Sequence, residues 1–387
     1  MKAMILAAGK GTRVRPITNT IPKPMIPLLR KPLMESIVEH LRLHGIREIM
    51  VNTSWLASVI ERYFGDGQQF GVDLGYSFEG RMEGDEIVGE ALGSAGGMKK
   101  IQDFSGFFDE TFIVVCGDAW IDLDIGKVYE FHKSRKAVAT IVLKEVPHEE
   151  TYKYGVVATD DDGRIRQFQE KPKPEDAVSN TINTGIYLFE PEVFDYIPSG
   201  KEYDIGGQLF PDLVARGLPF YGVNIPFQWV DIGSLPDLWD GTRDVLEGRI
   251  PGYPLPGKEI APGIRAGINV RINLDKVQIT PPVFIGSSSE IQDGAIIEGP
   301  TQIGANCVVE SGAELRQCII DDYTRVSGMT SLENKILFGD HCITPEGEAF
   351  DIKEMDIGFA VDDARKGLEM SEIHKLIFDL AEQAGRR

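Results

Sequence analysis

Two spacings of apolar residues divide the chain into a larger first part and a smaller second part. In the first part, short apolar runs predict strands at residues 4–6, 48–53, 72–78, 112–115 and 138–144. Segments with apolar residues at helical spacing alternate with these runs, at residues 33–44, 56–64 and 235–246. Because strands and helices alternate, we expect an α/β domain with a mostly parallel sheet over residues 1–247.

Beyond residue 262 the apolar residues recur every six positions. Seven aliphatic residues keep this period without a break: Ile279, Ile285, Ile291, Ile297, Ile303, Val309 and Leu315. The period is typical of a left-handed parallel β-helix, in which three hexapeptides make one turn. We expect this β-helix over residues 263–350. Asp321 interrupts the period, and Ile320 and Val326 can continue it with a shift.

A linker and a tail complete the chain. Residues 248–262 are expected to link the two parts, because prolines recur through them. In the tail, over residues 351–387, several apolar residues lie at helical spacing: Ile373, Leu376, Ile377, Leu380 and Ala384. They predict an amphipathic helix over residues 368–385, which could pack on the β-helix or on a second subunit.

The charges of the chain are unevenly spread, and this singles out its first 31 residues. The formal net charge is −20 over 387 residues, yet this stretch has no acidic residue. It has seven basic ones: Lys2, Lys10, Arg13, Arg15, Lys23, Arg30 and Lys31. A basic stretch in so acidic a protein predicts an anion site, and the overall acidity argues against nucleic-acid and membrane partners.

Two further features bear on location and redox state. Neither a long apolar run nor a signal-peptide pattern follows Met1, so a cytoplasmic protein is expected. The cysteines have no metal-ligand spacing and are expected to be reduced. They are Cys116, Cys307, Cys318 and Cys342.

The loop after the strand at 4–6 has the chemistry of a phosphate site. Gly9 and Gly11 permit positive φ and let backbone N–H groups approach phosphate oxygens. Arg13 offers a planar fork for phosphate oxygens, and Lys23 offers a point charge. An ordinary glycine turn with solvated cations is the alternative that this loop alone leaves open.

Two familiar phosphate loops are excluded, because the Walker pattern requires glycine at Met4 and the dinucleotide pattern requires it at Val14. The stretch instead resembles the signature of the sugar-nucleotide pyrophosphorylases, the nucleotidyltransferases that join an NTP to a sugar 1-phosphate. The match runs through Leu6-Ala7-Ala8-Gly9-x-Gly11-Thr12-Arg13, Pro16 and Pro22-Lys23-Pro24-Met25. The resemblance implies a Rossmann-like nucleotidyltransferase domain in which Arg13 and Lys23 are catalytic. It implies nucleotide binding by Leu6, Ala8, Gly9, Gly11, Thr12, Glu90 and Gly93.

Residues 79–97, which follow the strand predicted at 72–78, are expected to form a Gly-rich acidic connection. Within them, Leu92-Gly93-Ser94-Ala95-Gly96 resembles the family segment that lies against the nucleobase. Small residues there let the base approach the backbone. Glu90 could accept a hydrogen bond from a base N–H, or it could be a solvated loop charge.

Asp118 and Asp231 are the candidate ligands of Mg²⁺. Asp118 follows an apolar strand, where a carboxylate can bind Mg²⁺ together with substrate phosphates and waters. A turn or capping role is the alternative, and Asp122 and Asp124 are nearby competitors. By resemblance, Asp118 is the family's metal aspartate. The second metal carboxylate, Asp231, lies in the matching block Trp229-Val230-Asp231-Ile232-Gly233.

Three more blocks resemble the half of the family site that binds the sugar 1-phosphate. They are Tyr154-Gly155-Val156-Val157, Phe168-Gln169-Glu170-Lys171-Pro172 and Ile182-Asn183-Thr184-Gly185-Ile186-Tyr187. The resemblance implies that Gly155 lies against the sugar ring, Glu170 accepts sugar hydroxyls and Lys171 contacts the phosphate. It also implies a hydrogen bond between Asn183 and the sugar. The alternative for the pair at 170–171 is an exposed Glu-Lys before a proline.

The implied reaction converts an NTP and a sugar 1-phosphate into an NDP-sugar and pyrophosphate. Separately, we expect a homo-oligomer, because the few coils of a short β-helix leave exposed ends that another surface can cover. Residues 89–98 and 202–211 resemble the cyanobacterial type of UDP-glucose pyrophosphorylase. This resemblance favours UTP and glucose 1-phosphate as the substrates of this chain. Mannose-1-phosphate guanylyltransferases are the alternative. They generally have proline and valine where this chain has Gly97 and Gln169.

Two other classes of protein are weaker candidates. A hexapeptide acyltransferase needs a histidine on its β-helix, and only His341 lies near the expected coils. A non-catalytic regulatory homologue would be expected to lack phosphate or metal residues, whereas the candidates for both are in place.

Overall fold

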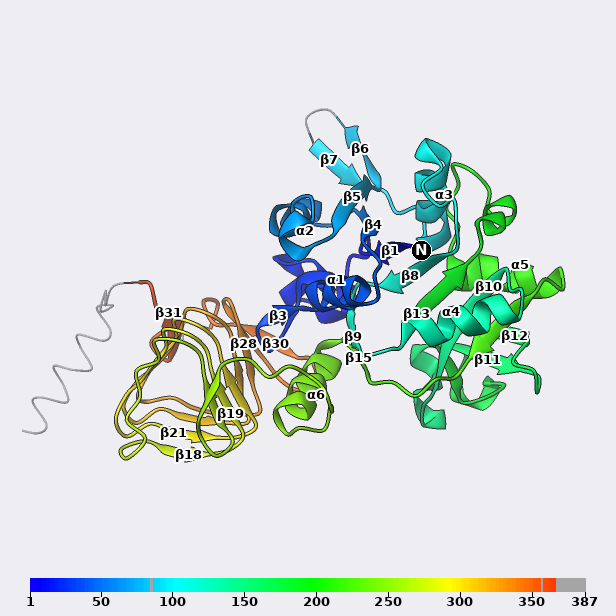
Figure 1. Ribbon diagram of the computed structural model, residues 1–387. Helices are drawn as coiled ribbons and strands as arrows, with labels where there is room; N and C mark the ends of the chain where they lie inside the picture. Colours follow the sequence, from blue (N-terminus) through cyan, green and yellow to red (C-terminus); the bar gives the residue numbers. More distant parts are fainter. Residues whose placement is uncertain (84–85, 356–357, 367–387) are drawn as a thin grey trace, which may run out of the picture. The chain divides into compact units, whose positions relative to one another are not determined.

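The structure is a computed structural model, which describes residues 1–83, 86–355 and 358–366. The chain forms two compact units, shown in Figure 1. Residues 1–27 and 31–231 form the first unit, and residues 28–30 join the second unit with the described residues from 232 onward. The helix α6 (Leu235–Leu246), which the sequence predicted with the same bounds, belongs to the second unit.

A nine-stranded sheet is the centre of the first unit, and one side of it, which ends at an edge strand, is parallel. Four neighbouring parallel strands lie there: β8 (Phe112–Cys116), β1 (Lys2–Leu6), β4 (Glu48–Thr53) and β5 (Asp73–Phe78). The helices α1 (Leu33–Leu43) and α2 (Ala57–Phe64) connect them, as the spacing of apolar residues predicted.

The rest of the sheet is mixed, which corrects the prediction of a mostly parallel sheet. Strand β13 (Thr181–Phe189) runs antiparallel to β8 and to β10 (Ala139–Glu145), which pairs in parallel with β14 (Phe220–Val223). Strands β11 (Gly155–Thr159) and β12 (Ile165–Glu170) are antiparallel. The connection between them, residues 160–164, is too short for the crossover that a parallel pair requires.

Both faces of β1 and β8 are buried. In β1, Ala3 and Ile5 pack in one apolar cluster and Met4 in the other, because successive side chains of a strand point to opposite faces. This double burial explains why the strands read as continuous apolar runs. The helices α4 (Ile125–Ser134) and α5 (Phe210–Ala215) contribute Val128 and Phe210 to these clusters.

The segment at 79–97 is more structured than the connection that the sequence predicted. It contains the antiparallel strands β6 (Gly80–Glu83) and β7 (Glu86–Gly89), and the helix α3 (Ser94–Ser105) begins within it. The sequence did not reveal α3, because Gly96 and Gly97 lie in its first turn and glycine weakens a helical pattern.

Three sheets of short strands form most of the second unit, and within each sheet the stacked neighbours are parallel. The first holds β17 (Ile264–Ala266), β19 (Val283–Ile285), β22 (Thr301–Ile303), β25 (Ile319–Ile320) and β28 (Ile336–Phe338). The second holds β18 (Gln278–Thr280), β21 (Ile296–Glu298), β24 (Glu314–Arg316) and β27 (Ser331–Glu333). The third holds β20 (Glu290–Ile291), β23 (Val308–Val309) and β26 (Thr324–Val326). Successive strands pass from sheet to sheet, so the chain coils (Figure 1).

The six-residue repeat supplies the interior of this coil. Apart from Ile279, which is partly buried, every residue of the repeat is at most 2% exposed. Ile285 pairs with Ile303 in the next turn, and Ile303 pairs with Ile320 in the turn after that. The turn from Ile303 to Ile320 is therefore one residue shorter than the turn from Ile285 to Ile303. The predicted shift of the period at Asp321 is therefore confirmed. At Gly286 the turns approach so closely that a Cβ atom would overlap the carbonyl of the next turn.

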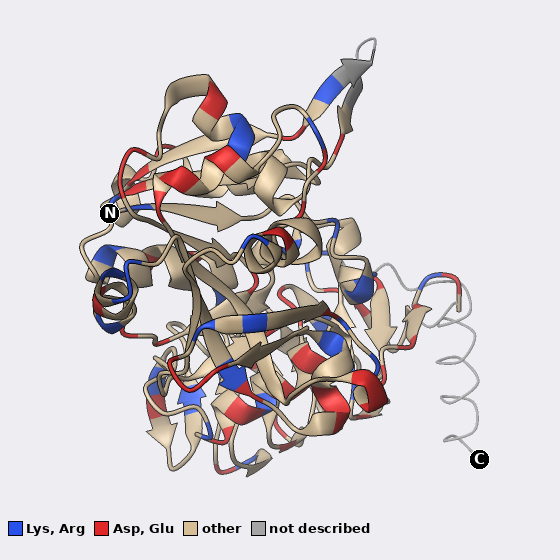
Figure 2. Cartoon of the chain, turned by 90° about the vertical axis from the view of Figure 1, so that its right-hand side faces the viewer, with Lys and Arg blue, Asp and Glu red and all other residues tan. Residues whose placement is uncertain are grey.

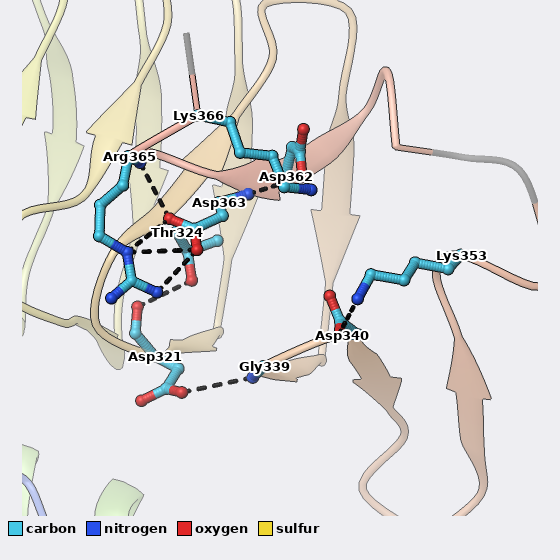
Figure 3. A network of polar contacts seen from close by, with 9 residues as sticks. All are labelled: Asp321, Thr324, Gly339, Asp340, Lys353, Asp362, Asp363, Arg365 and Lys366. Carbon is cyan, nitrogen blue, oxygen red and sulfur yellow. Dashed lines mark hydrogen bonds and ion pairs between the residues drawn. The ribbon is translucent and has the colours of Figure 1, made fainter.

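Antiparallel strands cover the last turns of the coil. Strands β29 (His341–Ile343) and β30 (Ala349–Asp351) extend the first sheet, and β31 (Val361–Asp363) pairs with β26. Figure 3 shows the polar contacts at this end, among them the ion pairs Asp363–Arg365 and Asp340–Lys353 and the bond from the Gly339 N–H to Asp321 Oδ2.

The helix predicted near the end of the chain and the possibility of a membrane-spanning helix are two separate questions. The amphipathic helix predicted over residues 368–385 lies outside the described residues. Within residues 1–83, 86–355 and 358–366, no helix has the length and apolar character that crossing a membrane requires.

Candidate active site

A cavity of about 280 Å³ lies at the carboxyl ends of β1, β4 and β8. Ligands of open α/β sheets bind beyond this edge. The predicted loop after β1 and the segment before α3 both reach the cavity, which is lined by Leu6, Ala7, Ala8, Gly9, Lys23, Pro24, Asn52, Glu79, Ala91, Gly93, Ser94, Cys116 and Asp118.

The loop after β1 is held by Gly11, which has a φ of +61°. Its carbonyl accepts a hydrogen bond of 2.8 Å from Thr18 Oγ1, and a Cβ atom at this position would lie 2.9 Å from Thr18 Cγ2. A side chain would therefore be strained and crowded. Gly9 has open space around it and no positive φ, so only Gly11 fulfils that part of the prediction.

The basic residues of the first 31 divide into two groups. Four of them form ion pairs: Lys2 with Asp109, Lys23 with Asp118, Arg30 with Asp322 and Lys31 with Glu39. Acidic and basic residues are interspersed over the helices and loops (Figure 2). Lys10, Arg13 and Arg15 are exposed and form no ion pair with any residue that the structure describes. The positive charge available to an anion therefore comes chiefly from these three residues.

A short two-stranded sheet brings Asp118 and Asp231 together. Strand β9 (Ala119–Ile121) is antiparallel to β15 (Trp229–Asp231), and Asp231 pairs with Ala119, the residue after Asp118. Lys23 Nζ donates to Asp118 Oδ2. Burial lowers the pKa of Lys23, but the charges of Asp118 and Asp231 outweigh it and leave the pKa raised, so the lysine stays charged.

The competing aspartates are engaged elsewhere. Asp122 Oδ1 accepts a bond of 2.6 Å from the Gln228 N–H, and Asp124 caps α4 by accepting from the Lys127 N–H at 3.2 Å. Among the described residues, no group of three His, Cys, Asp or Glu side chains could hold a metal ion. Two carboxylates still suit Mg²⁺, which keeps waters and substrate phosphates as further ligands.

A cysteine also lines the cavity. Cys116 ends β8, and burial, followed by the charges of Asp118 and Asp231, raises the pKa of its thiol. A thiol held protonated is a poor nucleophile. The cavity therefore offers the Lys23 ammonium and backbone groups rather than an activated cysteine.

The two runs that suggested a UDP-glucose pyrophosphorylase contact each other. Tyr203 exchanges backbone bonds of 2.8 Å with Leu92 and Gly96, and Ser94 Oγ donates to Asp204 Oδ2 at 2.7 Å. At Gly93, with a φ of +71°, a Cβ atom would lie 2.5 Å from the Tyr203 oxygen. The backbone before α3 is thus fixed by the segment at 202–204.

Glu90 lies apart from the cavity. Its carboxylate is half-exposed, and its Oε2 lies 2.9 Å from Arg81 Nη1 in an ion pair. The cavity is lined instead by the next residues, Ala91 and Gly93.

The candidates for the sugar half gather at the β11–β12 pair. Gly155 pairs with Glu170, and a Cβ atom at Gly155 would lie 3.2 Å from Glu170 Oε2. Lys171 has a φ of +47°, and its Nζ lies 3.1 Å from Glu170 Oε1. A Cβ atom at Gly206 would lie 2.8 Å from Glu170 Oε2, so this glycine is a close neighbour that sequence reasoning missed.

Asn183 is held by its own strand. Its Oδ1 accepts from the Gly185 N–H at 2.9 Å, and its Nδ2 donates to the Tyr187 hydroxyl at 3.0 Å. The side chain is thus oriented before any ligand binds.

Two buried polar residues of the cavity, Asn52 and Glu79, were also missed. Each lies at the carboxyl end of a strand, β4 or β5, beside the loop after β1. A polar residue at the end of a predicted strand was the signal that could have revealed them.

The arrangement of the sheet, the glycine loop and the paired carboxylates is that of a nucleotidyltransferase. The model of the nucleotidyl transferase family matches residues 2–248, and the chain belongs to this family. It is 55% identical to the UTP–glucose-1-phosphate uridylyltransferase of Synechocystis sp., over 94% of each chain.

Two other comparisons place the chain more broadly. It is 30% identical to the mannose-1-phosphate guanylyltransferase of Mycobacterium tuberculosis, over 80% of this chain and 82% of that one. The crystal structure of a UDP-glucose pyrophosphorylase complexed with UDP-glucose matches with a TM-score of 0.53 and 23% identity. That match covers 64% of this chain and 99% of the other, and it supports the fold.

Proposed function

We propose that the protein joins UTP to glucose 1-phosphate, producing UDP-glucose and pyrophosphate. The observation that carries this proposal is the 55% identity to the uridylyltransferase of Synechocystis over 94% of both chains. The contact between residues 89–98 and 202–211, the two runs that resemble that type of enzyme, adds support.

The chemistry requires positioning rather than a protein nucleophile. A phosphate oxygen of glucose 1-phosphate attacks the α-phosphorus of UTP in line. The bond from that phosphorus to the bridging oxygen of the β-phosphate breaks, and pyrophosphate leaves with the electron pair. The protein must bring two anionic phosphates together and stabilise the charge that moves to the leaving group.

The nucleotide half of the site is assigned to the loop after β1. Backbone N–H groups around Gly9 and Gly11 contact the triphosphate, with Leu6, Ala8, Thr12 and Gly93 beside the nucleotide. Arg13, which is exposed and forms no ion pair with a described residue, holds the leaving pyrophosphate. Lys23 stabilises the reacting phosphate from its buried position beside Asp118.

The sugar half is assigned to the β11–β12 pair. Gly155 leaves room for the sugar ring, Glu170 accepts hydrogen bonds from its hydroxyls and Lys171 contacts its phosphate. Asn183 adds a hydrogen bond to the sugar. The Lys171–Glu170 ion pair keeps both side chains near the same place before the substrate binds.

Asp118 and Asp231 fit a Mg²⁺ ion, and we assign them as its ligands. Mg²⁺, when bound, would neutralise phosphate charge. Lys23, which pairs with Asp118, would contact phosphate oxygens when the substrates bind.

Assembly is the role that we propose for the second unit, as a left-handed parallel β-helix. It carries exposed apolar side chains, such as Ile268 at 78% and Met329 at 72%, which a second copy could cover. We therefore expect a homo-oligomer. We also propose that the protein is cytoplasmic. A monomer at every working concentration in multi-angle light scattering would contradict this expectation.

One assay tests the proposed reaction. Purified protein with Mg²⁺ is given each of the four NTPs with the 1-phosphates of glucose, mannose, galactose and N-acetylglucosamine, and pyrophosphate release is followed. UTP with glucose 1-phosphate should give the highest kcat/KM. The Asp118→Asn variant and reactions without sugar phosphate control for contaminating enzymes. A preference for GTP and mannose 1-phosphate would replace the proposal by the guanylyltransferase reaction.

A further inference from the structure

A buried chain of hydrogen bonds runs beneath the cavity and joins its two walls. The Ala7 N–H donates to Asn52 Oδ1 at 2.8 Å, and Asn52 Nδ2 donates to Glu79 Oε1 at 2.7 Å. The Leu92 N–H donates to Glu79 Oε2 at 3.0 Å. Asn52 is 3% exposed and Glu79 is 1% exposed. The chain therefore links the loop after β1 to the segment before α3 through two buried side chains.

The ends of this chain bear on the nucleotide half of the site. Ala7 lines the cavity, and so do Ala91 and Gly93 on either side of Leu92. Fixing the N–H groups of Ala7 and Leu92 therefore fixes the distance between the two walls. Glu79 needs space for this role, and Gly97 provides it, because a Cβ atom at Gly97 would overlap Glu79 Oε1.

Every bond in the chain has a defined direction. Both oxygens of Glu79 accept from N–H groups, so the residue must offer two acceptors. Asn52 must accept from Ala7 and donate to Glu79. Burial raises the pKa of Glu79, while the hydrogen bonds from Leu92 and Asn52 and the charge of Lys100 oppose that rise. Where both carboxyl groups are ionised, neither side chain can be replaced by its amide or acid counterpart alone without leaving one contact unsatisfied.

We propose that Asn52 and Glu79 are positioning residues that set the width of the nucleotide slot and thereby the affinity for the NTP. The inference rests on the proposed function for the identity of the ligand. It predicts that breaking the chain weakens NTP binding and leaves the handling of the sugar 1-phosphate unchanged, because Glu170 ends another strand and Lys171 follows it.

Two single variants and their combination test the direction of the bonds. In Glu79→Gln, the amide has one acceptor for two N–H groups, and flipping Asn52 only moves the conflict to Ala7. In Asn52→Asp, two carboxylates face each other above neutral pH. The double variant, Asn52→Asp with Glu79→Gln, makes the order of donors and acceptors consistent again. The new carboxylate at position 52 accepts from Ala7 and from the new amide at position 79, whose oxygen accepts from Leu92. The net charge is that of the wild type.

The measurements are the KM of each substrate, kcat, and calorimetric binding of the NTP with Mg²⁺ and no sugar phosphate. Each single variant should weaken NTP binding by about tenfold or more, as expected for an unsatisfied buried group. The double variant should return to within about twofold of the wild type, in the range of well-tolerated substitutions. The KM of the sugar 1-phosphate should stay within about twofold of the wild-type value in both single variants and in the double variant.

A buried polar contact elsewhere supplies the control. Thr140 is fully buried, and its Oγ1 lies 2.8 Å from His132 Nδ1, away from the cavity lining. Thr140→Val should lower thermal stability without changing either KM. If Glu79→Gln behaves like this control, or if the double variant binds the NTP no better than the single variants, the inference is overturned.

The NTP in these tests is the one that the wild type uses fastest. A preference for another nucleotide would refute the proposed function and leave this test in place. Should one single variant fail to fold, recovery of NTP affinity in the double variant still decides the question.

Discussion

Lys171 offers the sharpest test of how the site is divided. Its side chain is 56% exposed and pairs with Glu170 at 3.1 Å. Exposed ion pairs contribute about 0–1 kcal/mol to stability. Lys171→Met keeps the length of the side chain and removes its charge, and Met and Lys, both unbranched at Cβ, bear a similar cost of the positive φ. The free energy of unfolding should therefore change by less than about 1 kcal/mol.

The kinetic effect should be much larger. A charge-assisted contact to phosphate contributes about 1.5–3 kcal/mol, which corresponds to about one to two decades in an equilibrium constant. If Lys171 contacts the sugar phosphate, its loss should raise the KM of glucose 1-phosphate by that factor. The KM of UTP should change by less than about twofold, as for a neutral surface substitution.

The assay is initial-rate kinetics with each substrate varied in turn at saturating levels of the other. Lys127→Met is a matched control, because Lys127 is 66% exposed and pairs with Asp124 at 3.4 Å, outside the candidate site. Lys23→Met is the contrasting variant and should lower kcat and the affinity for UTP. If Lys171→Met changes only the KM of UTP, the division into a nucleotide half and a sugar half is wrong. If it changes neither constant, the lysine is simply solvated.

Three further predictions address the metal, the sugar pocket and the second unit. Asp118→Asn should lower kcat by orders of magnitude, and EDTA should abolish wild-type activity, whereas Asp124→Asn should retain it; equal rates with EDTA and with Mg²⁺ would exclude the metal. Gly206→Ala should raise the KM of glucose 1-phosphate and not that of UTP, since its Cβ would lie 2.8 Å from Glu170 Oε2; unchanged kinetics would remove Gly206 from the sugar pocket. Burial raises the pKa of Asp321 to about 6, so the folded state binds more protons than the unfolded state between about pH 4 and 6, and stability should fall as pH rises through that window. Asp321→Asn should flatten this part of the curve of Tm against pH, and identical curves would contradict the assignment.

The sequence predicted the elements whose apolar spacing is regular. The strands β4 and β5 and the helices α1 and α6 are found within a residue or two of their predicted bounds. The six-residue period predicted the coil and even the shift at Asp321, because each repeat residue points into the interior. Local side-chain periodicity carries this information directly.

The direction of the outer strands could not be read in the same way. A buried strand has the same apolar pattern whether its neighbour is parallel or antiparallel, so the mixed sheet was not foreseen. The helix α3 was hidden by glycines that the structure needs for close approach, at Gly96 to the Lys201 carbonyl and at Gly97 to Glu79. In both cases contacts between distant segments decide the structure.

The candidate site was predicted as a set of residues but not as an arrangement. Motif spacing brought Lys23, Asp118 and Asp231 to attention, and the structure adds that Lys23 and Asp118 form an ion pair. The hydrogen-bond chain through Asn52 and Glu79 left no motif, because each residue is a single polar position at the end of a strand. The bonds between these residues form only because β4 and β5 are neighbours, and the order of strands in the sheet is a property of the fold.

The pairing of β9 with β15 has a consequence for the order in which the molecule becomes active. Asp118 and Asp231 are separated by more than a hundred residues, and Asp231 is the last residue of the first unit. Ribosomes add about 5–20 residues per second, so the nascent chain carries the first carboxylate roughly 6–20 s before the second. During that interval the glycine loop and Lys23 have already been made, but β15 has not. If both carboxylates bind Mg²⁺, as we propose, the enzyme is inert during translation until nearly all of its first unit has been synthesised.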